Sequence, residues 1–352
     1  MKKPLFIVGT GRCGSTLLSK MVRQHPTCLS ISEFFPPVTD LGFQLEPIFS
    51  PTLINGEQFW RLIATCYPGQ KLLLSHNFMW DVVLYPISAS SRYNQRTGIP
   101  AILLVMLPHL TDQPDVLFDE LHTWSLQRPS ASAMEHCQAL FQYLADRFGK
   151  TNWVERSGGS VRGVRQLAES FPEARFLHLV RDGRNCAISM SRYTTFRIVL
   201  IRFQQMELLG VDPFQSDDRT NIANLPDELR RLLPENFTAE AFWDYKISPI
   251  LCGHYWSGEI KLGVSALRQL PEERVKTLYF EDLLNNPVPQ VKALAEFLDE
   301  DVLSTPEVEQ WIAQSAAMVG KSRSQWEDLP VQEREELHQA CLPGFEVLQA
   351  YL

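Results

Sequence analysis

The sequence lacks a long hydrophobic run. Its longest apolar stretch, 101–107, ends at Pro108 and is far shorter than the roughly 18 residues that span a bilayer. The apolar stretch near the N-terminus, 5–8, holds four residues before Gly9, whereas the core of a signal peptide needs about 7–15. We therefore expect no transmembrane segment, no signal peptide and a cytoplasmic location.

Paired cysteines are also missing. The seven cysteines are odd in number and widely scattered, and no C-x-x-C pair occurs among them. Such a distribution favours reduced thiols in a cytosolic protein over a disulfide framework or a zinc site.

Basic charge is scarce overall but concentrated in two segments. The chain has 33 Lys and Arg residues against 41 Asp and Glu residues, a formal charge of −8, which argues against a general nucleic-acid binder. Residues 1–33, however, hold five basic residues and one acidic residue, and residues 151–200 hold eight arginines and four acidic residues. If folding brings these segments together, they can attract a small anionic ligand.

The chain shows no internal repeat, low-complexity tract or flexible linker, and its apolar pattern predicts an α/β fold. Three short apolar segments, 5–8, 176–180 and 275–280, each precede a turn and a helical pattern. This alternation is typical of a central parallel sheet flanked by helices. Helical spacing also predicts helices at 132–148 and 287–298.

Two long segments separate the expected strands. Residues 34–150 are predicted to be mostly helical, and residues 194–240 are more polar, with a loop around 212–225. Because the strands are dispersed along the chain, we expect a single domain over 1–352 that carries two large helical insertions, rather than two independent domains.

The clearest local motif follows the first expected strand, in Gly9-Thr10-Gly11-Arg12-Cys13-Gly14-Ser15-Thr16. Its glycines let backbone N–H groups close around an anion, and the helix that begins at Ser15 adds partial positive charge. We interpret this segment as a phosphate-binding loop in which Arg12 is the basic residue, rather than as a tight turn without a ligand.

Two nucleotide-binding motifs share parts of this loop. The nucleoside-triphosphate loop matches except that Ser15 stands where that motif has lysine. The dinucleotide pattern G-x-G-x-x-G matches at Gly9, Gly11 and Gly14, but no acidic residue closes a second strand near position 30 with βαβ spacing. The dinucleotide interpretation is therefore the weaker one.

A second basic turn follows the strand expected at 176–180. Arg181 leaves the strand end, and Ser189 comes eight residues later, about two helical turns on. Both side chains reach one phosphate only if the turn folds Arg181 back along the helix. An alternative makes Asp182 a Mg²⁺ ligand in a nucleotide kinase, but the missing loop lysine counts against it.

Together the two turns resemble the sulfotransferases that use 3′-phosphoadenosine 5′-phosphosulfate (PAPS). Residues 11–16 resemble the R-S-G-[ST]-T loop that binds the 5′-phosphosulfate in that family, with Cys13 in place of serine. Arg181 and Ser189 resemble its strand–R-x7-S–helix segment, which binds the 3′-phosphate. Further blocks resemble the W-x-E-K-[ST] turn, the Y-E-D-L strand end and the loop that closes over the nucleotide, at 153–157, 279–283 and 320–326.

The resemblance implies a P-loop nucleotide-binding fold and PAPS as the cofactor, released as 3′-phosphoadenosine 5′-phosphate (PAP). The cofactor-binding residues that it implies are Gly11, Arg12, Cys13, Gly14, Ser15, Thr16, Arg181, Ser189, Phe280, Lys321, Arg323 and Ser324. At Phe280 the family usually has tyrosine near the adenine, so stacking is expected to survive while a hydroxyl hydrogen bond is lost.

The resemblance also suggests the catalytic residues. Family members that use a histidine base carry it just after the turn at 153–157, and this chain has none there. In the branch with R-S-G-T loops a glutamate just past the second strand is the expected base, and Glu33 stands there. Arg12 is expected to contact the transferred group, and Arg156 is expected to assist by analogy with the family's lysine or to form a structural salt bridge. The alternative bases are His76, His109, His122 and His254.

Fixed guanidinium groups are expected to replace Mg²⁺, so we predict no metal. Most of the aromatic and aliphatic residues of the first insertion are expected to pack between helices, and some are expected to line an apolar acceptor pocket, suited to a small-molecule or lipid-like alcohol. A nucleotide-binding interaction protein without catalysis remains a further alternative, and the sequence does not indicate an oligomeric state.

Overall fold

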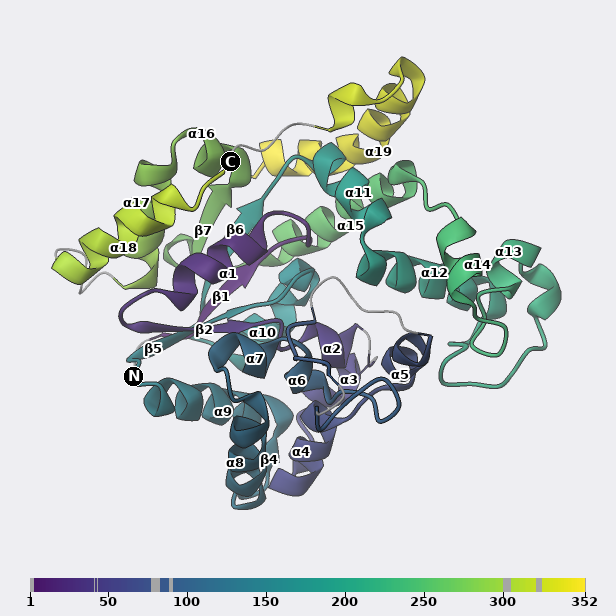
Figure 1. Ribbon diagram of the computed structural model, residues 1–352. Coiled ribbons are helices and arrows are strands. Elements are labelled where there is room, and N and C mark those ends of the chain that lie inside the picture. The colour runs from purple at the N-terminus through teal and green to yellow at the C-terminus, as the bar shows by residue number, and fades with distance from the viewer. Residues whose placement is uncertain are drawn as a thin grey trace.

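The computed structural model describes residues 3–40, 42, 44–76, 83–88, 91–299, 305–320 and 325–351 (Figure 1). A parallel five-stranded sheet, in the order β2-β5-β1-β6-β7, forms the centre of this part of the chain. Its strands are β1 (Leu5–Val8), β2 (Cys28–Ser32), β5 (Asn152–Arg156), β6 (Arg175–Val180) and β7 (Val275–Tyr279). The predicted α/β class is therefore confirmed.

Burial on both faces explains the composition of the sheet. All four residues of β1 and all five of β2 and β5 are buried, as in a parallel sheet that helices cover on both sides. Strand β5 lies between β2 and β1. An acidic residue, Glu33, does follow the second strand, but that strand is not the neighbour of β1 that a dinucleotide βαβ unit requires.

Helices from the N-terminal part, the middle and the C-terminal part of the chain flank the sheet. Helix α11 packs against α15, which in turn packs against α19, while Trp311 of α18 donates a hydrogen bond of 2.7 Å to the Met21 carbonyl in α1. These covering helices are α1 (Ser15–Arg23), α10 (Val164–Ser170), α11 (Gly183–Arg192), α15 (Pro249–Leu267), α16 (Phe280–Asn285), α17 (Pro287–Leu298), α18 (Pro306–Ala317) and α19 (Val331–Gln349).

The first insertion is mainly helical, as predicted. It contains α2 (Pro36–Thr39), α3 (Leu45–Phe49), α4 (Gly56–Ala64), α5 (Pro68–Ser75), α6 (Ala101–Leu104), α7 (Met106–Leu110), α8 (Pro114–Leu126) and α9 (Ala133–Arg147). A short antiparallel pair, β3 (Leu53–Ile54) and β4 (Ala131–Ser132), joins it. Helix α9 begins where the pattern indicated, because the Ser132 hydroxyl accepts from the Glu135 N–H and the Glu135 carboxylate accepts from the Ser132 N–H.

The second insertion contains α12 (Thr194–Leu209), α13 (Asp227–Arg230) and α14 (Ala239–Asp244). Residues 212–225 form no α-helix, in agreement with the predicted loop. In Figure 1 these helices lie on one side of the molecule, while α4, α8 and α9 lie together at another end. None of the helices in the described ranges combines the length and the apolar character that a bilayer span requires.

Candidate active site

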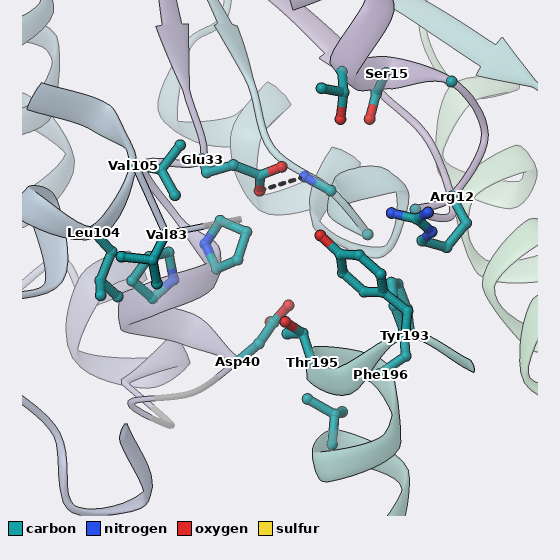
Figure 2. A pocket seen from close by; sticks show the side chains of 18 of the residues that line it. Arg12, Ser15, Glu33, Asp40, Val83, Leu104, Val105, Tyr193, Thr195 and Phe196 are labelled. Carbon is teal, nitrogen blue, oxygen red and sulfur yellow. Dashed lines mark hydrogen bonds between the residues drawn. The ribbon is translucent and has the colours of Figure 1, made fainter. Parts of the chain in front are cut away.

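A cavity of about 230 Å³ lies at the carboxyl edge of the sheet (Figure 2). Parallel strands all end at this edge, so the turns that follow β1, β2, β5 and β6 meet there. They contribute Gly11, Arg12, Gly14, Ser15 and Thr16 from the first turn, Glu33 from the second, Gly158 and Gly159 from the third and Arg181 from the fourth. The two predicted basic segments therefore meet at one site.

The glycine loop after β1 is shaped for close approach by an anion. Gly11 and Gly14 have φ angles of 79° and 96°, which glycine adopts without strain. Gly14 precedes α1, and no side chain caps this helix N-terminus. Ser15 and Thr16 line the cavity. Cys13 instead points into the core, and burial raises the pKa of its thiol, so only its backbone faces the loop.

Two arginines converge on this loop. Arg12 Nε donates a hydrogen bond of 2.9 Å to Ser189 Oγ, and its guanidinium lies 3.8 Å from the centre of the Tyr193 ring. Arg181 Nη1 donates to the Arg12 carbonyl at 3.0 Å, and its guanidinium lies 5.0 Å from the centre of the Phe280 ring. Neither arginine pairs with a carboxylate of the described residues, so both positive charges are available to an anionic ligand.

Both predicted residues of the second basic turn contact the glycine loop. Arg181 and Ser189 both contact Arg12, one at its carbonyl and the other at its Nε. Asp182 lies outside this cluster. Its carboxylate caps the N-terminus of α11, because it accepts a hydrogen bond from the Arg184 N–H at 2.9 Å. The same carboxylate pairs with the Arg184 guanidinium at 2.5 Å.

Phe280 starts α16 instead of ending β7 as predicted. Its ring lies against the glycine loop, since a Cβ atom on Gly14 would stand 2.3 Å from two of its ring carbons. The predicted phosphate ligands Lys321, Arg323 and Ser324 lie outside the described residues.

Glu33 follows the last residue of β2 and has a left-handed backbone conformation, with a φ angle of 54°. Among the described residues other than glycine, Arg12 also has a positive φ angle, of 55°. The Glu33 N–H donates to the Arg156 carbonyl at 2.8 Å. Its carboxylate accepts hydrogen bonds from Arg156 Nη1 and, at 2.9 Å, from the Gly158 N–H. These bonds direct the carboxylate toward the cavity (Figure 2).

Arg156 does not line the cavity. Its side chain is 4% exposed, pairs with Glu33, and donates from Nη2 to Ser32 Oγ at 2.6 Å. Of the two roles expected for Arg156, a contact with the transferred group and a structural salt bridge, the geometry matches the second. The neighbouring Glu155 is fully buried, and burial raises its pKa to about 8, while the Ser157 hydroxyl donates to its carboxylate.

The alternative histidine bases lie away from the cavity. His109 is buried with its Nε2 3.0 Å from Ser30 Oγ, and burial lowers its pKa to about 3. His122 stacks on Trp60, and His254 is exposed on α15. His76 ends α5 and contacts Phe237.

Several lining residues were not predicted from the sequence. Tyr193 stands four residues after Ser189, a spacing that places two residues on one helix face. The distance along the chain from Ser189 could therefore have identified Tyr193 as a lining residue. Asp40, Thr195 and Phe196 also line the cavity. They come from the two insertions, and no motif in the sequence marks them.

Residues 163–336 match the sulfotransferase domain family. The matched region contains the Arg181–Ser189 segment, β7 and α15–α17, whereas the glycine loop and Glu33 precede it. No curated protein matches the chain.

Three solved structures are similar to the chain. The sulfotransferase domain of the Synechococcus PCC 7002 olefin synthase is 14% identical, with a TM-score of 0.45, over 100% of this chain and 96% of that one. The sulfotransferase domain from the curacin biosynthetic pathway is 14% identical, with a TM-score of 0.45, over 96% and 97%. Sulfotransferase STF9 from Mycobacterium avium is 16% identical, with a TM-score of 0.47, over 99% and 76%.

Because these identities and TM-scores are low, the assignment to a family rests on the match of residues 163–336. That match covers the second basic turn, which contacts the glycine loop at the carboxyl edge of the parallel sheet. The sulfotransferase family predicted from the sequence is therefore confirmed for the matched region, 163–336.

Proposed function

We propose that this protein transfers the sulfuryl group of PAPS to a hydroxyl or amine group of a small acceptor, without a metal ion, and that Glu33 is the general base. The observation that carries the proposal is the composition of one cavity. Arg12 and Arg181, which pair with no carboxylate of the described residues, lie beside the uncapped N-terminus of α1, and Glu33 projects into the same space. The same cavity therefore offers a site for an anion and a site for an acceptor group that loses a proton to Glu33.

The residues present suit a phosphosulfate group. The open N-terminus of α1 offers backbone N–H groups and partial positive charge, and the Ser15 and Thr16 hydroxyls add donors. Arg181 and Ser189 are assigned to the 3′-phosphate, with Phe280 beside the adenine. When bound, PAPS supplies an activated sulfuryl group and is released as PAP.

Glu33 is held in place for proton removal. Arg156 occupies one side of its carboxylate and the Gly158 N–H the other, but each carboxylate oxygen has a second lone pair that remains free for an acceptor hydroxyl. Arg12 is planar and permanently charged, so it stabilises negative charge that develops on the oxygens of the transferred group. Such fixed guanidinium groups do the work that Mg²⁺ does in phosphoryl transfer.

Ligand-induced thermal shifts test the nucleotide class. We expect PAP to raise the melting temperature in proportion to RT ln(1 + [L]/Kd), and ATP and NAD to have little effect at equal concentration. Stabilisation by ATP together with strict Mg²⁺ dependence of turnover would favour the kinase alternative. Tight PAP binding without turnover of any acceptor would favour the interaction protein.

Substitution of Glu33 tests the base. We expect Glu33→Gln to abolish PAP release in the presence of acceptor while leaving the affinity for PAP nearly unchanged, because the amide cannot accept the proton. Glu46→Gln is the matched control, since Glu46 is an exposed acidic residue on α3 outside the cavity. An active Glu33→Gln protein would move the search for the base to the histidines.

A further inference from the structure

The cavity contains a second carboxyl group, that of Asp40 at the end of α2. The Gly158–Gly159 turn separates it from Glu33. A Cβ atom on Gly158 would stand 3.4 Å from Glu33 Oε1, and one on Gly159 would stand 3.9 Å from Asp40 Oδ2. Asp40 Oδ1 accepts from the Thr39 hydroxyl at 3.1 Å, whereas Oδ2 has no hydrogen-bond partner among the described residues. This oxygen is thus available as a hydrogen-bond acceptor for a group in the cavity.

The Thr195 hydroxyl is unpartnered as well. It belongs to the first turn of α12, and its Oγ1 atom is buried without a hydrogen-bond partner in the described part of the chain. Figure 2 shows the Asp40 carboxyl and the Thr195 hydroxyl directed toward the same part of the pocket. Buried polar atoms normally have partners, so the unpaired Thr195 hydroxyl, which lies beside the Asp40 carboxyl, points to a ligand group that both contact.

The rest of this end of the cavity is apolar. Val83, Leu104 and Val105 come from the first insertion, and Phe196 and Val199 from the second. Such walls bind hydrocarbon and leave few polar contacts to fix its orientation. Two polar positions therefore border this apolar space, Glu33 on one side of the Gly158–Gly159 turn and Asp40 with Thr195 on the other.

The surroundings of Asp40 favour a neutral partner over a cation. Arg162 lies behind Asp40, donates to Glu259 at 2.8 Å and contacts the Tyr255 hydroxyl. Burial raises the pKa of Asp40, the positive charge of Arg162 and the hydrogen bond from Thr39 oppose that rise, and the negative charge of Glu33 adds to it. Arg162 already supplies positive charge near this carboxyl, and Arg12 and Arg181 line the same cavity, so an additional ammonium group would meet like charges.

We propose that Asp40 and Thr195 form an acceptor subsite for a second hydroxyl group. The acceptor class is then an apolar molecule with two hydroxyl groups, of which one faces Glu33 and is sulfated while the other is held by Asp40 and Thr195. In this arrangement Asp40 and Thr195 determine the preference of the enzyme for acceptors with two hydroxyl groups over acceptors with one. The inference rests on the proposed function for the role of Glu33, and its binding test does not require turnover.

The test compares diols with single alcohols. Straight-chain α,ω-diols and 1-alkanols of matched length, from butane to decane, are titrated calorimetrically into the full-length protein, with and without PAP. We expect the best-fitting diol to bind roughly tenfold more tightly than its 1-alkanol, the scale of one hydrogen bond to a charged group. We also expect the ratio of kcat/KM between the two to follow the same order.

Asp40→Asn and Thr195→Val are each expected to bring the two affinities within about threefold of each other. The matched controls, Asp112→Asn and Thr123→Val, change exposed residues outside the cavity and should keep the preference. Equal affinity of the wild-type protein for diols and alkanols overturns the subsite, as does a preference that both cavity variants retain. Tighter binding of α,ω-amino alcohols than of diols overturns the inference that Asp40 and Thr195 hold an uncharged hydroxyl group. Failure to bind PAP, with the diol preference intact, overturns the proposed function instead.

Discussion

Replacement of Arg156 by methionine separates the role of this residue in holding Glu33 from a role in holding the ligand. Methionine keeps much of the length and the apolar volume of the arginine side chain while removing its charge and donors. Arg156 and Glu33 are 4% and 14% exposed, so the substitution leaves a carboxylate that is largely buried without its positive partner.

The expected loss of stability follows from that burial. Removal of one partner of a buried ion pair costs about 3–5 kcal/mol. Glu33 keeps the hydrogen bond from Gly158 and some contact with the cavity, which places the cost at the lower end. The Ser32 hydroxyl loses its bond to Arg156 Nη2, which adds roughly 1 kcal/mol. We therefore expect the free energy of unfolding to fall by about 3–4 kcal/mol.

Urea unfolding, followed by the fluorescence of the eight tryptophans, measures this loss, provided that the m-value stays unchanged. Arg165→Met is the matched control, because Arg165 is exposed on α10 and its loss should change stability by no more than about 0.5 kcal/mol. In a Glu33→Gln background the same Arg156 substitution should cost clearly less, since no charge is left unpaired.

A loss below about 1 kcal/mol for Arg156→Met, or strict additivity with Glu33→Gln, would refute the reasoning. Turnover adds a second criterion. If Arg156 acts by positioning Glu33, the variant should lose kcat while PAP affinity stays close to that of the wild type. Comparable losses in PAP affinity and kcat would instead mean that Arg156 reaches the cofactor.

Three further predictions concern single residues. Arg12→Ala should lower turnover by roughly 10²–10³, the scale for one lost transition-state donor, and full activity in a sulfate-transfer assay would remove Arg12 from the mechanism. Arg181→Ala should weaken PAP binding, measured by calorimetry, far more than it raises the KM of the acceptor; equal losses contradict its assignment. Because the pKa of Glu155 is raised to about 8 in the folded protein, the native state retains a proton there that the unfolded chain releases near pH 4.5. Wild-type stability should therefore fall as pH rises from 4.5 to 8, by at most about 1.4 kcal/mol per pH unit from this group. Glu155→Gln should lose that slope in urea midpoints, and parallel pH profiles of the two proteins would contradict the assignment.

The sequence predicts those elements whose apolar residues form a nearly continuous run or recur at helical spacing. Strand β1 and helix α17 have the expected bounds, and β6 begins one residue earlier than expected. Strand β5 was interpreted only as a family turn, since Glu155 and Arg156 interrupt its apolar pattern. Both residues are nevertheless buried, because Ser157 and Glu33 provide hydrogen-bonding partners that a one-dimensional pattern does not contain.

The site was predictable to the extent that strand ends define it. Arg12, Glu33 and Arg181 each follow a parallel strand, so their meeting at one edge follows from the fold class. The direction of the Arg156 side chain could not be predicted from the fold class, since it depends on which neighbouring residue offers a carboxylate. Asp40 and Thr195 were missed because helices of two different insertions bring them together, and no spacing along the chain relates them.

The left-handed backbone at Arg12 and Glu33 has a consequence for protein engineering. Side chains other than glycine adopt this conformation at a cost of about 1–2 kcal/mol per residue, and here the rest of the fold bears that cost before any ligand arrives. Grafting arginine and glutamate onto the equivalent turns of another P-loop scaffold would reproduce the chemical groups without their directions. A successful transplant must copy two peptide conformations as well as two residue identities.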